Sequence, residues 1–299
     1  MLTIQAAPGY FLVERRTIIN HRTFEFKSND GVKLFGRAWL TTRKKPKNVI
    51  NLVHGLGEHS HRYAHVAEAF NAAGYHLVAF DLRGHGLSEG KRGHAPGFIQ
   101  LFDDIQTFLQ ESERKFGLEE APFLYGHSLG GSLVINYCLQ RDPHLSGVIA
   151  TAPALSLVSE PSKIKLLLAK GLAKLLPALT ISNELEPDYL SHDQAIVKAY
   201  QDDALVHDKI SFKLALDLYE WGKTALDNAQ NWKIPLLLMH GTADQITAHQ
   251  SSKAFSQRSN SKVELVLWES FYHEVHNDLG KEKVINKMID WCDQIQDTG

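Results

Sequence analysis

The chain has 299 residues, 43% of them hydrophobic, and a formal net charge of −2 at pH 7. This length and apolar content suit one large α/β domain, or a core domain that carries an insertion. Because the charges nearly cancel and no basic block recurs, nucleic acid is not expected as a partner, and neither is a strongly charged substrate. The expected partner is a neutral small molecule.

The sequence features that report on the cellular compartment point to the cytoplasm. Residues 1–17 lack the basic start and long apolar run of a secretory signal. Cys138 and Cys292 are the only cysteines and have no CxxC spacing, so neither a disulfide framework nor a structural zinc site is expected. The longest apolar stretch, residues 163–179, contains four lysines and is too short for a membrane span. Any membrane contact is therefore expected to be peripheral.

Short apolar runs alternate with amphipathic segments along most of the chain. Two opening strands are predicted, over residues 23–28 and 33–40, and later strands over residues 48–55, 75–82, 121–128, 147–153, 234–241 and 262–268. Helices are predicted between most of them, including residues 62–74, 98–117 and 129–142. Buried strands joined by helical crossovers indicate a mostly parallel central sheet of about eight strands, flanked by helices.

The alternation stops between about Leu155 and Asn228. This stretch is helical in pattern, is interrupted by prolines, and contains no predicted strand. We interpret residues 155–228 as a helical cap inserted into a core formed by residues 1–154 and 229–299. The cap is expected over the carboxyl ends of the strands, where open α/β sheets bind ligands.

A serine lies among small residues where a predicted strand meets a predicted helix. The segment Gly-His-Ser-Leu-Gly at residues 126–130 fits G-x-S-x-G, the strained strand-to-helix turn that exposes a nucleophilic serine in α/β-hydrolases. The start of the following helix favours a negative charge that develops nearby. Ser128 is therefore the predicted nucleophile.

A serine hydroxyl needs a base, and the base needs an acid that orients it. In this fold the chain order is serine, acid, histidine. Asp244 and His273 each follow a predicted strand, in that order, and are the predicted acid and base. His276, three residues further on, is the alternative base. Other acids fit the order less well, because they lie in the insertion or after the histidine: Asp208, Asp217, Asp227 and Asp278.

Two backbone N–H groups are expected to stabilise the oxyanion of the reaction. The N–H of Leu129 comes directly after the nucleophile, and the N–H of Leu56 lies in the loop after the strand at residues 48–55. His61 and His65 have the spacing of a helical metal site, but no acidic or cysteine ligand set of recognised spacing accompanies them. No metal and no other cofactor is expected.

The loop at residues 81–90 also carries reactive side chains. Asp81, Arg83, His85 and Ser88 follow an earlier strand and precede the nucleophile. We interpret this loop as a structural turn in which Asp81 and Arg83 brace neighbouring loops.

Taken together, five segments resemble the monoacylglycerol lipase group of α/β-hydrolases, which includes lysophospholipase-like and serine aminopeptidase-like members. They are HGLGEHSHRY, FDLRGHGLSEGKRGH, GHSLGG, HGTADQIT and FYHEVHND. The resemblance implies Ser128, Asp244 and His273 as the triad, Leu56 and Leu129 as the oxyanion donors, and a helical cap.

The resemblance also implies a polar end of the site that holds the glycerol hydroxyls. Glu58 and His276 would lie there, joined by Tyr200 from the cap. As alternatives, Glu58 pairs with Arg62 four residues on, and Tyr200 only packs.

The predicted protein is a cofactor-free serine hydrolase that cleaves the ester bond of a single-chain lipid, monoacylglycerol, through an acyl-enzyme. The alternatives are a lysophospholipase, a general carboxylesterase, or a lipid-binding protein that keeps the serine turn but does not catalyse the reaction.

In the cap segment at residues 162–179, Lys163, Lys170 and Lys174 form a narrow stripe among leucines. This pattern predicts either contact with a lipid surface or a helix that is packed on both sides.

Overall fold

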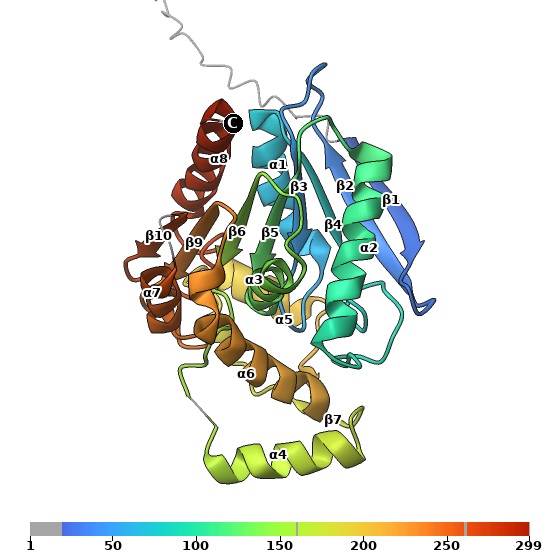
Figure 1. The fold of residues 1–299 in the computed structure, drawn as a ribbon, viewed down its shortest axis with the longest axis vertical. Helices are drawn as coiled ribbons and strands as arrows, with labels where there is room; N and C mark the ends of the chain where they lie inside the picture. Colours follow the sequence, from blue (N-terminus) through green and yellow to red (C-terminus); the bar gives the residue numbers. More distant parts are fainter. Residues whose placement is uncertain (1–19, 160, 260–261, 299) are drawn as a thin grey trace, which may run out of the picture.

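The computed structural model describes residues 20–159, 161–259 and 262–298, so the N-terminal segment in which no secretory signal is expected lies outside the described residues. An eight-stranded sheet with strand order β1-β2-β4-β3-β5-β6-β9-β10 forms its centre (Figure 1). The strands are β1 Asn20–Lys27, β2 Lys33–Leu40, β3 Val49–Val53, β4 His76–Phe80, β5 Phe123–His127, β6 Gly147–Thr151, β9 Leu236–Gly241 and β10 Val263–Trp268. Of these eight strands, β2 alone runs opposite to the other seven, which confirms the mostly parallel sheet.

The parallel register brings the carboxyl ends of four strands to one edge of the sheet. His127 of β5 is level with Thr151 of β6, and Thr151 is level with Met239 of β9. On the far side of β9, Gly241 pairs with Trp268 of β10. The loops that follow β5, β9 and β10 therefore start close together, and these loops carry the predicted triad.

Helices cover both faces of the sheet (Figure 1). α1 Ala64–Ala73, preceded by the 3-10 turn η1 Ser60–Tyr63, and α8 Lys281–Thr298 pack on one face. The other face is covered by α2 Phe98–Phe116, α3 Leu129–Arg141 and α7 His249–Arg258. Side chains of β5 alternate between the two resulting cores, with Leu124 in one and Phe123 and Tyr125 in the other. The inner strands β3, β5, β6 and β9 are buried along their whole length because helices cover both of their faces, whereas the edge strand β1 is mostly exposed.

The inserted region contains α4 Lys163–Leu175, β7 Thr180–Ser182, η2 Pro187–Tyr189, α5 Gln194–Asp202, β8 Lys209–Ser211 and α6 Phe212–Asp227, and η3 Ala229–Asn231 follows it. The expectation that it holds no strand is wrong, because β7 and β8 pair antiparallel. Strands of three residues are too short to show an alternating pattern, and their pairing joins distant parts of the chain.

The two long helices of the insertion differ in how they meet the core. α6 packs on α2 and α3, and its Trp221 stacks on Phe98 with 6.0 Å between ring centroids. α4 packs on α6 and is the outermost element in Figure 1. We propose that residues 155–228 act as a cap whose outer wall is α4. In the described part of the chain, no helix combines the length and the apolar character that crossing a bilayer requires.

Candidate active site

Ser128 occupies a strained turn between β5 and α3. Its backbone angles, φ 54° and ψ −115°, lie in a region that side-chain-bearing residues rarely adopt. Two backbone hydrogen bonds hold the turn: Ser128 donates to the Thr151 carbonyl at 3.0 Å, and the Ser128 carbonyl accepts from Ala154 at 3.0 Å. Gly130 is needed for close packing, because a Cβ there would overlap the carbonyl oxygen of Val53. Neighbouring strands thus hold the serine in a conformation that costs free energy.

The structure brings together the three residues predicted as the triad. His273 Nε2 lies 2.9 Å from Ser128 Oγ, and His273 Nδ1 lies 2.7 Å from Asp244 Oδ2. With its proton on Nδ1, the imidazole presents the Nε2 lone pair to the serine hydroxyl. This is the arrangement in which a serine can lose its proton as it attacks a carbonyl carbon.

Asp244 and His273 shift each other's protonation. Burial alone would lower the pKa of His273, but the carboxylate of Asp244 outweighs burial and raises the pKa above its ordinary 6.5. Burial would raise the pKa of Asp244, but the charge of His273 and the hydrogen bond from His240 hold it far below its usual range. Asp244 therefore stays ionised, which is the state that the acid of a Ser-His-Asp triad needs in order to stabilise an imidazolium.

His127, the residue before the nucleophile, is a buried neutral imidazole. Burial, followed by the nearby charge of His273, lowers the pKa of His127 to about 4. Its Nδ1 lies 3.1 Å from the hydroxyl of Thr151, and its side chain lines the cavity beside Ser128. His127 therefore adds no charge to the site at neutral pH.

The two residues predicted as oxyanion donors, Leu56 and Leu129, both line the same cavity as Ser128. Leu129 is the first residue of α3, where backbone N–H groups point toward the helix start. The loop that carries Leu56 is held on both sides. Gly55 N donates to Glu58 Oε1 at 2.6 Å, and the Gly57 carbonyl accepts from the backbone of His207 at 2.9 Å.

Beside the triad lies a buried cluster of two carboxylates and one guanidinium. Arg62 donates to Glu58 at 2.7 Å and to both oxygens of Glu274 at 2.6 and 2.8 Å. Burial alone would raise the pKa of Glu58, but the charge of Arg62, together with His127, His54 and the hydrogen bond from Tyr63, outweighs burial and lowers the pKa to about 2. The predicted pairing of Glu58 with Arg62 is confirmed, and Glu58 also lines the cavity, so its contact with the glycerol hydroxyls stays a prediction.

Glu274 was not among the residues predicted from the sequence. It lines the cavity and is 2% exposed. Its place directly after His273, in the segment YHEVHND, is the signal that could have indicated it.

The structure does not bring His276 to the cavity wall. His276 is fully buried, stacks on Tyr63 with 4.8 Å between ring centroids, and meets His127 edge to face at 4.7 Å. Within the described residues, neither of its ring nitrogens has a hydrogen-bond partner. The turn that contains His273 directs the two histidines to different sides, so His276 lies behind His127.

Tyr200 lines the cavity from the cap, and Arg62 lies over its ring with Cζ 4.8 Å from the centroid. The tyrosine therefore contacts the acidic cluster as well as the cavity.

Of the two histidines considered for a metal site, His65 donates from Nε2 to the backbone carbonyl of His276 at 2.9 Å.

The cavity has a volume of about 1190 Å³ and runs from Ser128 beneath the inserted region. Apart from the acidic cluster, its walls are mainly apolar side chains of the insertion, among them Leu166, Leu172, Ile210, Leu216, Leu218 and Leu226. A polar end beside the nucleophile thus continues into a long apolar compartment, which suits an amphipathic ligand.

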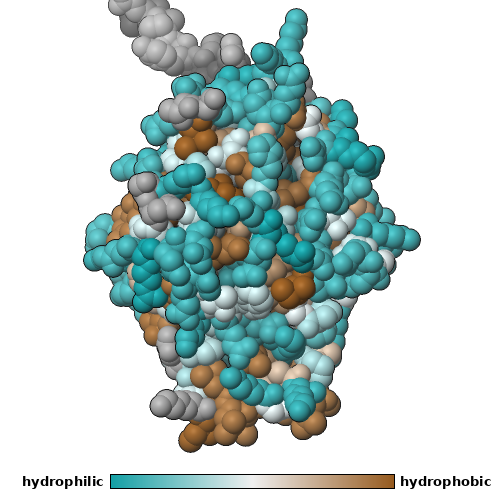
Figure 2. Space-filling view, in the orientation of Figure 1, coloured by the Kyte–Doolittle hydropathy of each residue, from teal (hydrophilic) through white to brown (hydrophobic). Residues whose placement is uncertain are grey.

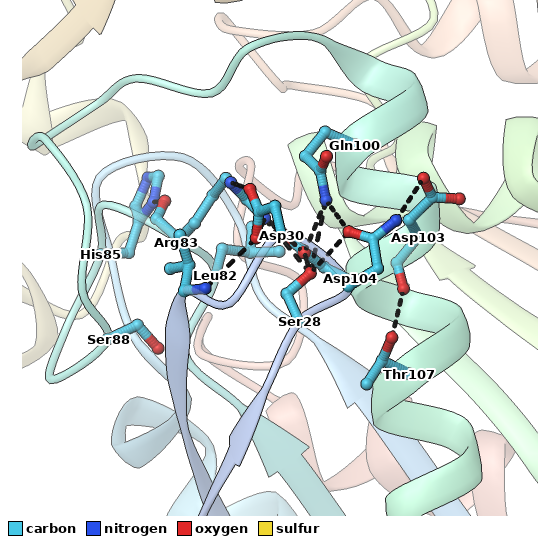
Figure 3. Close-up of polar contacts among 12 residues, drawn as sticks. Ser28, Asp30, Leu82, Arg83, His85, Ser88, Gln100, Asp103, Asp104 and Thr107 are labelled. Atoms are coloured by element: carbon cyan, nitrogen blue, oxygen red, sulfur yellow. Dashed lines mark hydrogen bonds and ion pairs between the residues drawn. The ribbon is translucent and has the colours of Figure 1, made fainter.

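The loop after β4 braces its neighbours, as predicted. Arg83 forms an ion pair with buried Asp104 of α2 at 2.6 Å and with Asp30 of the β1–β2 turn at 2.8 Å (Figure 3). Asp81 accepts hydrogen bonds from the backbone of Ser60 at 2.9 Å and of Leu87 at 2.8 Å. These side chains are not part of the cavity wall.

The triad geometry and the fold agree with what known proteins show. The sequence profile described as serine aminopeptidase, S33 matches residues 44–280. The chain belongs to the serine aminopeptidase S33 family. Membership in this family confirms the resemblance to lipase-like α/β-hydrolases that the sequence motifs indicated, and it makes the protein a serine hydrolase.

Three similar proteins illustrate the breadth of the match to the S33 family. An uncharacterised abhydrolase domain-containing protein of Dictyostelium discoideum is 40% identical over 88% of this chain, which spans only 28% of that protein. A monoacylglycerol lipase of Mycolicibacterium smegmatis is 32% identical over 89% of this chain and 95% of its own length. The crystal structure of Paleococcus ferrophilus monoacylglycerol lipase matches with TM-score 0.80 and 35% identity, covering 89% of this chain and 99% of that one.

Proposed function

We propose that this protein hydrolyses monoacylglycerol to a fatty acid and glycerol, with Ser128 as nucleophile, His273 as base and Asp244 as the orienting acid. The observation that carries the proposal is the position of the Ser128–His273 hydrogen bond at the polar end of a long apolar cavity. The similarity to monoacylglycerol lipases supports the substrate class.

In the proposed reaction, His273 Nε2 takes the proton of Ser128 as Oγ attacks the ester carbonyl carbon. The N–H groups of Leu56 and Leu129 would stabilise the oxyanion. Glycerol then leaves with the proton from His273, and an acyl-serine remains. A water molecule, deprotonated by the same imidazole, releases the fatty acid and restores the serine. No cofactor takes part.

The acidic cluster favours a neutral alcohol group over an anionic one. Glu58 and Glu274 contribute two negative charges against the one positive charge of Arg62, and all three side chains are buried by at least nine-tenths. A phosphate-bearing headgroup would be repelled there, whereas glycerol hydroxyls can donate to carboxylate oxygens. The cluster therefore supports monoacylglycerol rather than a lysophospholipid.

We also propose that α4 meets a lipid surface. Several apolar side chains of α4 are largely exposed to solvent: Ile164 is 73% exposed, Leu167 72% and Leu175 77%. Figure 2 shows hydrophobic colour gathered at the bottom of the molecule, where Figure 1 places α4. Lys170 and Lys174 are also exposed and suit the headgroup level of a bilayer. The side chains of Lys163 and Lys165 lie outside the described part.

A substrate panel tests the reaction. We expect Ser128-dependent hydrolysis of a long-chain monoacylglycerol with kcat/KM at least tenfold above that of a lysophosphatidic acid with the same acyl chain. The Ser128→Ala variant is the matched control, and labelling with a fluorophosphonate distinguishes an enzyme from a silent lipid-binding protein. Equal rates on both lipids would argue against monoacylglycerol as the preferred substrate.

Vesicle binding tests the surface contact. Changing Ile164 and Leu167 to serine should weaken binding to vesicles and slow the hydrolysis of long-chain monoacylglycerol more than that of a short nitrophenyl ester. Serine at Ile99 and Leu279, which are 51% and 63% exposed outside α4, is the matched control. If both pairs of changes had the same effect, α4 would not be the lipid-binding element.

A further inference from the structure

A second buried histidine is bound to the acid of the triad. His240 belongs to β9, four residues before Asp244, and is fully buried. Its Nε2 lies 3.0 Å from Asp244 Oδ2, the same oxygen that lies 2.7 Å from Nδ1 of His273. Two imidazoles therefore share one carboxylate oxygen.

The neighbours of His240 determine which of its nitrogens carries the proton. Nε2 faces two acceptors, the Asp244 carboxylate and the backbone carbonyl of Thr247 at 3.1 Å. Nδ1 lies 2.8 Å from the hydroxyl of Ser252 in α7, which can donate to it. A neutral imidazole with its proton on Nε2 satisfies all of these groups. His240 is thus oriented as a donor to Asp244.

The carboxylate of Asp244 has its remaining positions filled by local donors. Oδ1 accepts from the backbone of Ile246 at 2.7 Å and of Thr247 at 3.0 Å, and Oδ2 accepts from the Thr247 hydroxyl at 2.8 Å. These donors come from the turn that carries Asp244 itself. His240 is different, because it belongs to a strand of the central sheet and, through Ser252, connects the carboxylate to α7.

We propose that His240, oriented by Ser252, is a positioning residue that aims Asp244 at His273 and takes up part of its negative charge. The inference rests on the proposed roles of Ser128, Asp244 and His273. A donor that stabilises the carboxylate weakens its attraction for the proton on His273. His240 therefore tunes the base without touching the substrate.

Other charged and titratable groups face the two histidines. His249 of α7 lies 6.3 Å from His240, between ring centroids. Glu274 and Glu58 act on His273 along with Asp244, while His127 of β5 contacts its ring at 4.9 Å between centroids. Within the described residues, none of these four groups donates a hydrogen bond to Asp244. Apart from His273, His240 is the one imidazole in the described part of the chain that does so, and it acts beside the Thr247 hydroxyl on the same oxygen.

Two substitutions separate the hydrogen bond from packing. His240→Gln keeps an N–H donor near the position of Nε2, whereas His240→Met has similar bulk and no donor. With a short nitrophenyl ester, and with rates normalised to sites labelled by a fluorophosphonate, we expect kcat to fall about ten- to a hundredfold in His240→Met. KM should stay within about twofold, because the residue does not line the cavity.

The pH profile of kcat/KM distinguishes a hydrogen-bonding role of His240 from a packing role, because a loss of packing alone would not move the midpoint of the profile. In His240→Met the midpoint of the profile should move to higher pH, since the carboxylate holds the proton on His273 more strongly. His240→Gln should recover most of kcat and the original midpoint. Ser252→Ala should move the midpoint in the same direction by less, and this variant decides the matter if His240→Met does not fold.

An unchanged midpoint in both His240→Met and Ser252→Ala would overturn the inference, as would equal losses in the glutamine and methionine variants. Absence of Ser128-dependent hydrolysis in the unchanged protein would instead overturn the proposed function.

Discussion

The backbone carbonyl of Gly57 accepts a hydrogen bond from the backbone N–H of His207 at 2.9 Å. Gly57 follows Leu56, a proposed oxyanion donor, and His207 belongs to the inserted region. A second contact joins the same two parts of the protein, because His59 Nε2 lies 2.8 Å from Asp203 Oδ2. The loop that carries Leu56 is therefore held by two contacts with the inserted region.

We predict that Gly57→Ala lowers kcat by about tenfold or more while the fold remains intact. Gly57 has φ +78°, which is unfavourable for alanine, and a Cβ there would overlap the carbonyl oxygen of His207. The loop must shift, and the N–H of Leu56 shifts with it. Loss of one oxyanion donor costs about a hundredfold or more in kcat, so a partial displacement should cost less. Steady-state kinetics with a short ester measures the effect.

Gly31→Ala is the matched control for Gly57→Ala. Gly31 has a similar φ of +87°, lies in the β1–β2 turn, and leaves open space where the new Cβ would stand. It should lower stability slightly and leave kcat unchanged. Normal kcat in Gly57→Ala would show that the Leu56 N–H does not act in the reaction.

Much of the fold and the order of the site residues could be predicted from the sequence, because they depend on local pattern. Ser128 lies between a buried strand and a helix, and Asp244 and His273 each follow a buried strand. These features are visible in a few consecutive residues. The parallel sheet then brings the strand ends together, so the predicted triad meets in space.

The rest depends on contacts between distant residues. The ion pair of Arg62 with Glu274 joins residues 212 positions apart, and the pairing of β7 with β8 joins strands that are each three residues long. The position of His276 behind His127 is set by the turn after β10, not by its spacing from His273. No local pattern reports such relationships, and the family resemblance, which implied a place for His276 at the polar end, does not report them either.

We predict that replacing Ser128 separates activity from stability. Ser128→Ala should lower turnover about a thousandfold or more, because the nucleophile is removed. Ser128→Gly should be equally inactive but more stable than Ser128→Ala by about 1 kcal/mol, since glycine relieves the strain of φ 54° at some entropic cost. Thermal unfolding of both variants tests this. Equal stabilities would mean that the elbow stores no strain that glycine can release.

The activity should depend on one ionisation with a midpoint above pH 6.5. His273 must be neutral to accept the serine proton, and Asp244 raises the pKa of His273 above its ordinary value despite burial. Activity is therefore lost as the pH falls through this raised value and is full above it. Glu274 also raises the pKa of His273, so Glu274→Gln should move the midpoint of kcat/KM to lower pH. A midpoint that does not move would show that the charge of Glu274 does not affect the pKa of His273.

Arg62→Met should destabilise the protein by about 3–5 kcal/mol at neutral pH, because it leaves the buried carboxylates of Glu58 and Glu274 without their cation. The pKa of Glu58 is lowered to about 2, with Arg62 as the largest lowering cause. The unchanged protein therefore gains stability from this group above pH 4.5 and loses it as the pH falls toward 2. Without Arg62, burial raises the pKa of Glu58. As the pH falls, the buried carboxylate takes up a proton, and the destabilisation of the Arg62→Met variant becomes smaller. The difference in free energy of unfolding between the two proteins should therefore be largest near pH 7 and shrink below pH 5.

Urea unfolding at several pH values measures this difference. Arg114→Met is the control, since Arg114 is 62% exposed in its pair with Glu111. A difference that is small at pH 7, or that does not change with pH, would mean that the charges of this cluster are not what holds it together.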